Sequence, residues 1–127
     1  DYPGSKKVST EELLTAKCDI LIPGALENQI TAAIAKKLNC KIIAGGANNQ
    51  LLNTSVADDL HERGILFIPD ILINSGGVIG LTKDFLNRDD AKTEEALKEI
   101  ADRVKEAIIF SKEKSISINE TLKSKDL

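Results

Sequence analysis

The chain has 127 residues, of which 42% are hydrophobic and 29% charged, and its formal net charge is -3. These values are typical of one globular domain, and aromatic residues at only 3% require that its core be aliphatic. We expect no nucleic-acid partner and no membrane span, because the chain lacks a basic stripe with interleaved aromatics and has no apolar run near roughly 20 residues.

The first half of the chain alternates between amphipathic segments and short apolar runs. A helix is predicted to begin at Ser9, because Glu12 follows it in the spacing of a capping box. Strands are predicted at Cys18–Ile22, Lys41–Ala44 and Ile65–Ile68, since each run is predominantly apolar and stops at small or amide-bearing residues. Strands of this kind are typical of parallel sheets that are covered on both faces.

Helices are predicted between these strands and after the last one. The spacing of apolar residues predicts a helix over 29–38 and another over 54–63, with Gly64 at the carboxyl end of the second. Asp70 is placed to start a helix after the third strand. A final helix over about 91–114 carries an apolar stripe on one face and balanced Lys and Glu on the other, which indicates a solvated outer face.

The order of these elements predicts an α/β fold. We expect a three-layer, Rossmann-like parallel sheet with flanking helices and right-handed crossovers. Three strands are fewer than the roughly five or six of a complete doubly wound domain, so the sheet is expected to be incomplete, with further strands before Asp1. Residues 1–127 would then be a single partial domain that ends in a helix and a polar tail. The chain contains no Met, which fits a fragment or a processed chain.

The segments that follow the three predicted strands point to a ligand site. In open α/β sheets, ligands bind at the edge where the carboxyl ends of the strands meet. Pro23–Ala25 follows the first strand, Gly45–Gln50 the second and Asn74–Gly77 the third. Small residues admit a ligand close to the backbone and Asn offers both a donor and an acceptor, yet both types also serve turn geometry and tight packing. The residues by themselves leave both interpretations open.

Few residues point to nucleophilic, acid–base or metal chemistry. Cys18 and Cys40 each begin a predicted strand, and two thiols beside an aliphatic core favour a reducing cytoplasm, although adjacent strand starts could also form a disulfide. No metal site is expected, because the chain has no CxxC pair and His61 is its only histidine. His61 is expected to be exposed on its helix. Asp58 and Asp70 are interpreted as surface or helix-start carboxylates.

Three segments resemble the glutamate/leucine/phenylalanine/valine dehydrogenase family. Cys18–Asn28 is similar to the family's CDILIPAALEN segment, and Ala44–Leu51 to its EGAN or GSANNQL segment. Asn74–Val78 follows in the family's order and spacing. The resemblance covers nearly the whole chain and weakens after Leu86, and several motifs in register make it more specific than a single glycine pattern.

The resemblance implies that the chain is the later part of an NAD(P)-binding domain. The parent enzyme would reversibly deaminate an L-amino acid to a 2-oxo acid and ammonia, with NAD or NADP as cofactor, in a homo-oligomer. The family's phosphate loop, catalytic Lys and catalytic Asp would lie before Asp1, so no catalytic residue is expected in this chain, and we expect it to be inactive alone. The alternative is a non-catalytic binding or assembly module that keeps the fold.

The resemblance also implies roles for individual residues. Ala25 and Asn48 would lie along the nicotinamide ribose, with Gly24 leaving room beside them. Asn74 would contact the carboxamide or the substrate end of the cleft.

Val78 and Leu81 are implied to face the substrate side chain. Glutamate-specific members generally place a serine at the Leu81 position, and a leucine there would leave the γ-carboxylate unpaired at a cost of about 1–3 kcal/mol. Leu81 and the Asn48–Leu51 segment therefore favour an apolar substrate such as leucine. In contrast, Leu26–Asn28 is more similar to the glutamate branch.

Overall fold

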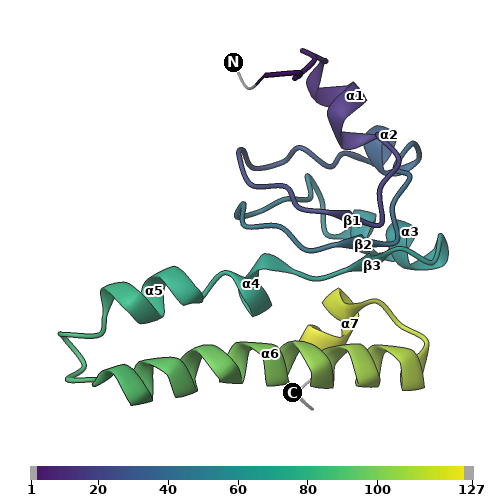
Figure 1. Ribbon diagram of the computed structural model, residues 1–127. Coiled ribbons are helices and arrows are strands. Elements are labelled where there is room, and N and C mark those ends of the chain that lie inside the picture. The colour runs from purple at the N-terminus through teal and green to yellow at the C-terminus, as the bar shows by residue number, and fades with distance from the viewer. Residues whose placement is uncertain (1–2, 125–127) are drawn as a thin grey trace.

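A parallel three-stranded sheet lies in the upper half of the computed structural model, which describes residues 3–124 (Figure 1). Its strands β1 (Ile20–Leu21), β2 (Ile42–Ile43) and β3 (Leu66–Phe67) are hydrogen-bonded in the order β1-β2-β3. The first residue of each strand opposes the first residue of the next. The predicted parallel order is confirmed, although each strand is shorter than predicted. The ends of the predicted domain, residues 1–2 and 125–127, lie outside the described residues.

The first helix forms where the capping box predicts it. Helix α1 (Thr10–Leu14) has Ser9 as its N-cap, and the backbone N–H of Ser9 donates to the Glu12 carboxylate over 2.8 Å. The reciprocal bond runs from the backbone N–H of Glu12 to the Ser9 hydroxyl oxygen over 3.2 Å. Two backbone donors at the start of the helix are therefore satisfied locally.

The helix predicted over 29–38 is much shorter than expected. Helix α2 spans only Ala32–Ala35 and begins after Thr31, whose hydroxyl oxygen caps it. Ile30 is fully buried and instead forms a parallel bridge with Leu51. The spacing of the apolar residues predicted that Ile30 lies on a helix face. Ile30 is instead buried because it pairs with Leu51 in a distant loop, so the predicted helix was wrong at this residue.

The remaining helices carry the chain past the sheet. Gly64 has a φ of 73° at the end of the third helix, as predicted for a residue in the left-handed region. A break at Asn74 and Ser75 separates the helix that begins at Asp70 from the next one. These helices are α3 (Ser55–Glu62), α4 (Asp70–Ile73), α5 (Gly76–Leu81), α6 (Asp90–Lys114) and α7 (Ile118–Lys123).

Helices cover both faces of the sheet. Successive residues of a strand point to opposite faces. Phe67 belongs to an apolar cluster with Leu60 of α3, whereas Leu66 packs against a second cluster that includes Ala107 of α6 and Ile118 of α7. The predicted α/β class with helices flanking a parallel sheet is confirmed.

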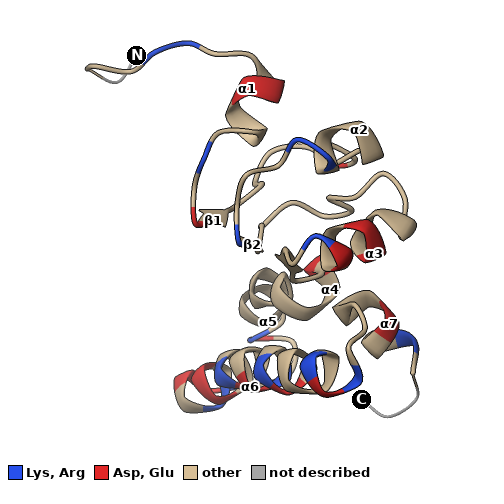
Figure 2. Ribbon diagram, turned by 90° about the vertical axis from the view of Figure 1, so that its right-hand side faces the viewer, with Lys and Arg blue, Asp and Glu red and all other residues tan. Residues whose placement is uncertain are grey.

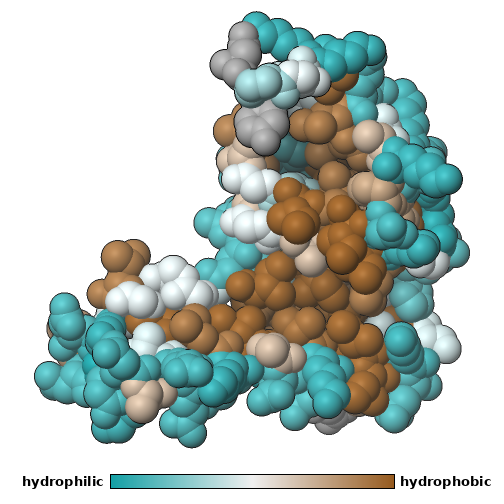
Figure 3. Space-filling model, viewed as in Figure 1, coloured by the Kyte–Doolittle hydropathy of each residue, from teal (hydrophilic) through white to brown (hydrophobic). Residues whose placement is uncertain are grey.

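Helix α5 and the first half of α6 extend beyond the sheet as an arm, which gives the molecule the L-shaped outline of Figure 3. Acidic and basic residues alternate along α6 (Figure 2), and i,i+4 ion pairs join Lys98 to Glu94 and Arg103 to Glu99. None of the helices within residues 3–124 is both long and apolar enough to cross a membrane.

Strand β1 lies at one edge of the described sheet. Two apolar residues at this edge are open to solvent: Ile20, the first residue of β1, is 52% exposed, and Ile22, just after the strand, is 68% exposed.

Candidate functional site

The loops after β1 and β2 touch each other through their backbones. The backbone N–H of Ala47 donates to the Pro23 carbonyl oxygen over 3.0 Å. A Cβ added at Gly45 would lie 2.2 Å from that same oxygen, so only glycine permits this approach. At Gly24 and Gly46, in contrast, an added Cβ would meet no atom of the described chain within 4 Å. The contact between the loops is therefore tight at Gly45, whereas Gly24 and Gly46 have open space beside their backbones.

The side chain of Gln50 holds the second loop through hydrogen bonds to its backbone. Its side chain is buried, and Nε2 donates to the carbonyl oxygens of Gly45 and Ala47 over 2.9 and 3.0 Å. Its Oε1 is buried without a hydrogen-bond partner among residues 3–124. This role of Gln50 was not predicted from the sequence. It could have been inferred from the position of an amide side chain at the end of a glycine-containing loop, because backbone carbonyl groups in such a loop need hydrogen-bond donors.

Asn74 joins the end of α4 to the same loop. Its Nδ2 donates to the carbonyl oxygen of Gly46 over 2.9 Å, with further contacts of 3.2 Å to the Ala47 carbonyl and to Asn48 Oδ1. The predicted residues Asn48 and Asn74 are therefore in direct contact. Because both donor hydrogens of Asn74 face acceptors of the protein, Oδ1 is the atom of this side chain left to accept from a ligand.

Asp70, the first residue of α4, holds the loop that follows β2. The carboxylate Oδ2 accepts the backbone N–H of Asn49 over 2.9 Å, and Asn49 has a φ of 48° in the left-handed region. Asp70 does start α4, as predicted, but its side chain also positions the second loop. Together these contacts shape an open hollow of about 540 Å³, called here the amide hollow, whose lining includes Asn48, Asn49, Asp70, Asn74 and Asn119.

The predicted residues of the first loop line a neighbouring space. Gly24 and Ala25 border an apolar hollow of about 260 Å³ together with Leu13 and Leu14 from α1 and Leu21 from β1. All three loops extend from the carboxyl ends of the parallel strands, so Gly24, Ala25, Asn48 and Asn74 share one edge of the sheet. The edge thus combines an amide-lined space and an apolar one.

Val78 and Leu81 lie apart from both hollows. They are on α5, where they are 61% and 87% exposed, and they are separated by one helical turn. Phe85 lies four residues after the end of α5 and is also exposed. The structure therefore places these residues on the arm rather than with Asn48 and Asn74.

The chain was compared with protein families, with curated proteins and with solved structures. The profile described as "Glutamate/Leucine/Phenylalanine/Valine dehydrogenase" matches residues 1–122. The chain belongs to this dehydrogenase family. The resemblance noted in the sequence is thereby confirmed over almost the whole chain.

Two curated dehydrogenases of the family illustrate the match. An NADP-specific glutamate dehydrogenase of Saccharolobus shibatae is 48% identical over 111 residues, which cover 84% of this chain and 26% of that protein. A leucine dehydrogenase of Bacillus subtilis is 39% identical over 97 residues, covering 76% of this chain and 26% of that enzyme. The chain therefore spans about a quarter of the length of these relatives.

Solved dehydrogenases share the fold. The L-tryptophan dehydrogenase from Nostoc punctiforme has a TM-score of 0.84 and 31% identity, covering 92% of this chain and 36% of that one. A hetero-hexameric glutamate dehydrogenase from Thermus thermophilus has a TM-score of 0.70 at 19% identity, covering 91% of this chain and 29% of that one. The Rossmann-like fold class of the chain is therefore supported by structure as well as by sequence.

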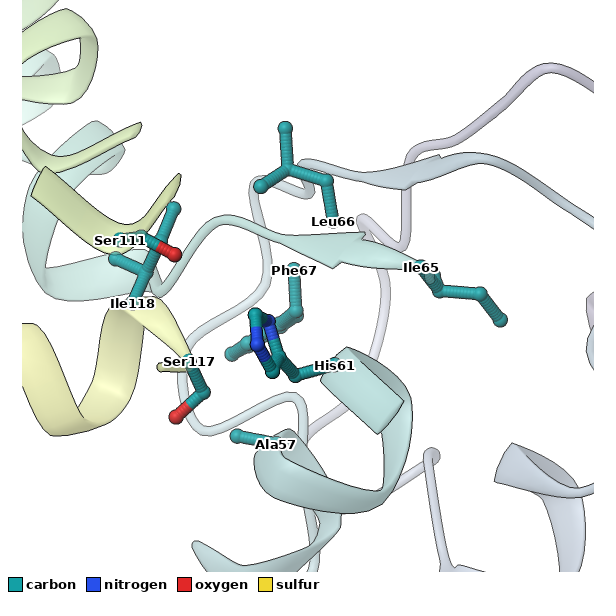
Figure 4. Close-up of a pocket in the computed structure, with 8 residues that line it drawn as sticks. All are labelled: Ala57, His61, Ile65, Leu66, Phe67, Ser111, Ser117 and Ile118. Atoms are coloured by element: carbon teal, nitrogen blue, oxygen red, sulfur yellow. The ribbon is translucent and has the colours of Figure 1, made fainter. Parts of the chain in front are cut away.

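The single histidine of the chain is half-buried, contrary to the expectation that it is exposed. Figure 4 shows His61 beside Ser111, Ser117 and Ile118 in a cavity of about 10 Å³, which is the size of a single water site. Helix α7 covers this face of α3, and that long-range contact is what the local sequence could not indicate.

Ser117 fastens α7 to α3 at the same place. Its hydroxyl donates to Asp58 Oδ1 over 2.6 Å and also caps α7 by accepting the backbone N–H of Glu120 over 3.2 Å. Asp58, interpreted from sequence as a surface or helix-start carboxylate, therefore holds the carboxyl-terminal helix. Among the described residues, no group of three or more His, Cys, Asp or Glu side chains is arranged to hold a metal ion.

Proposed function

We propose that the protein containing this chain is an NAD(P)-dependent amino-acid dehydrogenase and that this chain forms the nicotinamide side of its cleft. The observation that carries the proposal is the contact between Asn74 and the loop of Asn48 at the carboxyl edge of a parallel sheet. Open α/β sheets bind their ligands at that edge. Family membership supplies the reaction class, reversible oxidative deamination of an L-amino acid to a 2-oxo acid and ammonia.

The residues of this edge fit a nicotinamide nucleotide. The open backbone at Gly24 leaves space for a sugar or ring to approach, and the exposed Asn48 side chain lies beside it on the same edge. Asn74 Oδ1 would accept from the carboxamide N–H, since the Asn74 donors are already directed at the second loop. The cofactor, when bound, accepts or donates the hydride. The role of these residues is to hold and orient it.

Val78 and Leu81 are proposed to meet the substrate side chain. Both are apolar and exposed, so they can bury against a branched aliphatic group without unsatisfied polar atoms. A glutamate γ-carboxylate placed against Leu81 would lose a hydrogen-bond partner at a cost of about 1–3 kcal/mol. We therefore propose an apolar amino acid such as leucine as the preferred substrate.

The chain by itself is proposed to be inactive, because the family resemblance implies that the catalytic Lys and Asp lie before Asp1. We further propose a homo-oligomer, from family membership, and a cytoplasmic setting, supported by Cys18 and Cys40 being free thiols.

The test is amino-acid oxidation by the protein that contains this chain, with NAD and NADP supplied in separate assays. We expect higher kcat/KM for leucine than for glutamate, and no turnover by residues 1–127 alone. Leu81→Ser should shift the ratio toward glutamate by roughly tenfold or more. The matched control is Leu86→Ser, which changes an exposed leucine beyond α5 and should leave the ratio unchanged. Absence of oxidation with every L-amino acid would contradict the proposed activity.

A further inference from the structure

The two cysteines lie side by side at the amino-terminal edge of the sheet, opposite the candidate site. The backbone N–H of Cys18 donates to the carbonyl oxygen of Asn39 over 3.0 Å, and the N–H of Lys41 donates to the carbonyl oxygen of Asp19 over 3.0 Å. These two bonds connect the residues at and after Cys18 to those before and after Cys40. The side chains of Lys41 and Asp19 add an ion pair of 2.8 Å across the same two segments.

The spacing of the two backbones suits a disulfide. Ile20 of β1 opposes Ile42 of β2, and stepping two residues back along both strands brings Cys18 opposite Cys40. Adjacent strands lie about 4.7–4.9 Å apart, and the Cα atoms of a disulfide are usually about 4.4–6.8 Å apart. The separation expected for the two Cα atoms therefore falls within the range found in disulfides.

Both thiols are accessible to a small reagent. They are free and half-buried, and both line one open hollow of about 600 Å³. Burial raises the pKa of the Cys40 thiol, and the neighbouring Cys18 thiol raises it further. This influence of one thiol on the other agrees with the backbone bonds that join the two segments.

We propose that Cys18 and Cys40 are a redox modification site that forms a reversible intrachain disulfide on reaction with a low-molecular-weight disulfide such as oxidised glutathione. One protein thiolate attacks a glutathione sulfur, which forms a mixed disulfide and releases one glutathione thiolate. The second protein thiolate then attacks the protein sulfur of that mixed disulfide and releases the second glutathione. Two protein thiols are oxidised, and one glutathione disulfide is reduced to two thiols.

The disulfide would act on the stability of the sheet rather than on the candidate site. It would close the loop that contains β1, Pro23–Ala25 and α2, and that ends two residues before β2. Cross-linking such a loop limits the unfolded chain and raises the temperature of unfolding. The amide hollow lies at the other end of the strands, so binding there should persist in both redox states. This inference is independent of the proposed dehydrogenase activity.

The test is to incubate the purified protein with oxidised glutathione, block the remaining thiols with iodoacetamide, and measure the intact mass and the peptide map. We expect a loss of two hydrogen atoms, no alkylation at either cysteine, and one linked peptide pair containing Cys18 and Cys40. Dithiothreitol should restore both alkylation sites. The oxidised form should unfold at a temperature several degrees above that of the reduced form.

Single variants provide the matched controls. Cys18→Ser and Cys40→Ser each retain one thiol, so each should end as a glutathione adduct with no gain in unfolding temperature. If the unmodified protein also stops at glutathione adducts, forms only interchain dimers, or keeps both thiols alkylatable, the proposed disulfide is wrong.

Discussion

Replacing Asn74 tests whether the contact between α4 and the second loop holds the candidate site together. Asn74→Ala removes the donor for Gly46 and the contacts to Ala47 and Asn48. An amide group has two donor hydrogens, and each neutral hydrogen bond contributes about 0.5–1.5 kcal/mol to stability. We therefore expect the free energy of unfolding to fall by about 1–3 kcal/mol.

Asn74→Asp should be more destabilising at neutral pH than Asn74→Ala. The carboxylate has nearly the same shape as the amide, but its oxygens would face the same carbonyl oxygens without a hydrogen to donate. The expected order of stability is wild type, then Asn74→Ala, then Asn74→Asp. This order separates the loss of the hydrogen bonds from a simple loss of side-chain volume.

Urea unfolding measures these differences. With a slope of about 1–3 kcal/mol per M, the Asn74→Ala midpoint should fall by roughly 1 M. Asn53→Ala is the matched control, because Asn53 is exposed and its side chain makes no hydrogen bond to another residue within 3–124. A midpoint for Asn74→Ala equal to that of the Asn53→Ala control would refute the argument that these bonds hold the loop. In the protein that contains this chain, Asn74→Ala should also weaken binding of the reduced cofactor, measured by fluorescence titration.

Further substitutions test the packing and the helix caps. Gly45→Ala should destabilise the fold by about 2 kcal/mol or more, because its Cβ would lie 2.2 Å from a carbonyl oxygen of the first loop. Gly46→Ala is the control, because a Cβ there has open space. Its free energy of unfolding in the same assay should lie within about 1 kcal/mol of the wild-type value. Ser117→Ala should cost about 1–3 kcal/mol and speed hydrogen exchange in α7, since it loses both the cap and the bond to Asp58. The pKa of Glu12 is lowered from 4.5 by the backbone N–H and then the hydroxyl of its cap residue, so its contribution to α1 is present above pH 4.5 and is lost as the pH falls through the lowered pKa. Glu12→Gln should remove that pH dependence from the α1 amide signals in an NMR titration, and an unchanged titration would contradict it.

Much of the fold could be predicted because its signals are local. The capping box at Ser9 and the left-handed Gly64 follow from short-range backbone needs, and both lie where predicted. The parallel sheet followed from apolar runs that alternate with helices. The fate of Ile30 could not be predicted in this way, because its burial depends on Leu51, a partner far along the chain.

The position of the candidate site in the fold could be predicted more completely than the hydrogen bonds within it. The edge that carries Gly24, Asn48 and Asn74 follows from strand order alone. The sequence could not show that the Asn74 side chain donates to the second loop, or that the Gln50 side chain donates to carbonyl oxygens of the same loop. An Asn or Gln side chain can bond in many directions, and only the folded backbone selects one. Their roles toward cofactor, and those of Val78 and Leu81 toward substrate, remain predictions.

The open edge at β1 has a consequence for handling this chain. An edge strand with exposed apolar side chains, here Ile20 within β1 and Ile22 just after it, is a template onto which another molecule can add a strand. At high concentration the isolated chain should therefore self-associate through β1 and eventually aggregate. A charged gatekeeper such as Ile22→Lys would oppose this addition while leaving the buried side of the sheet unchanged.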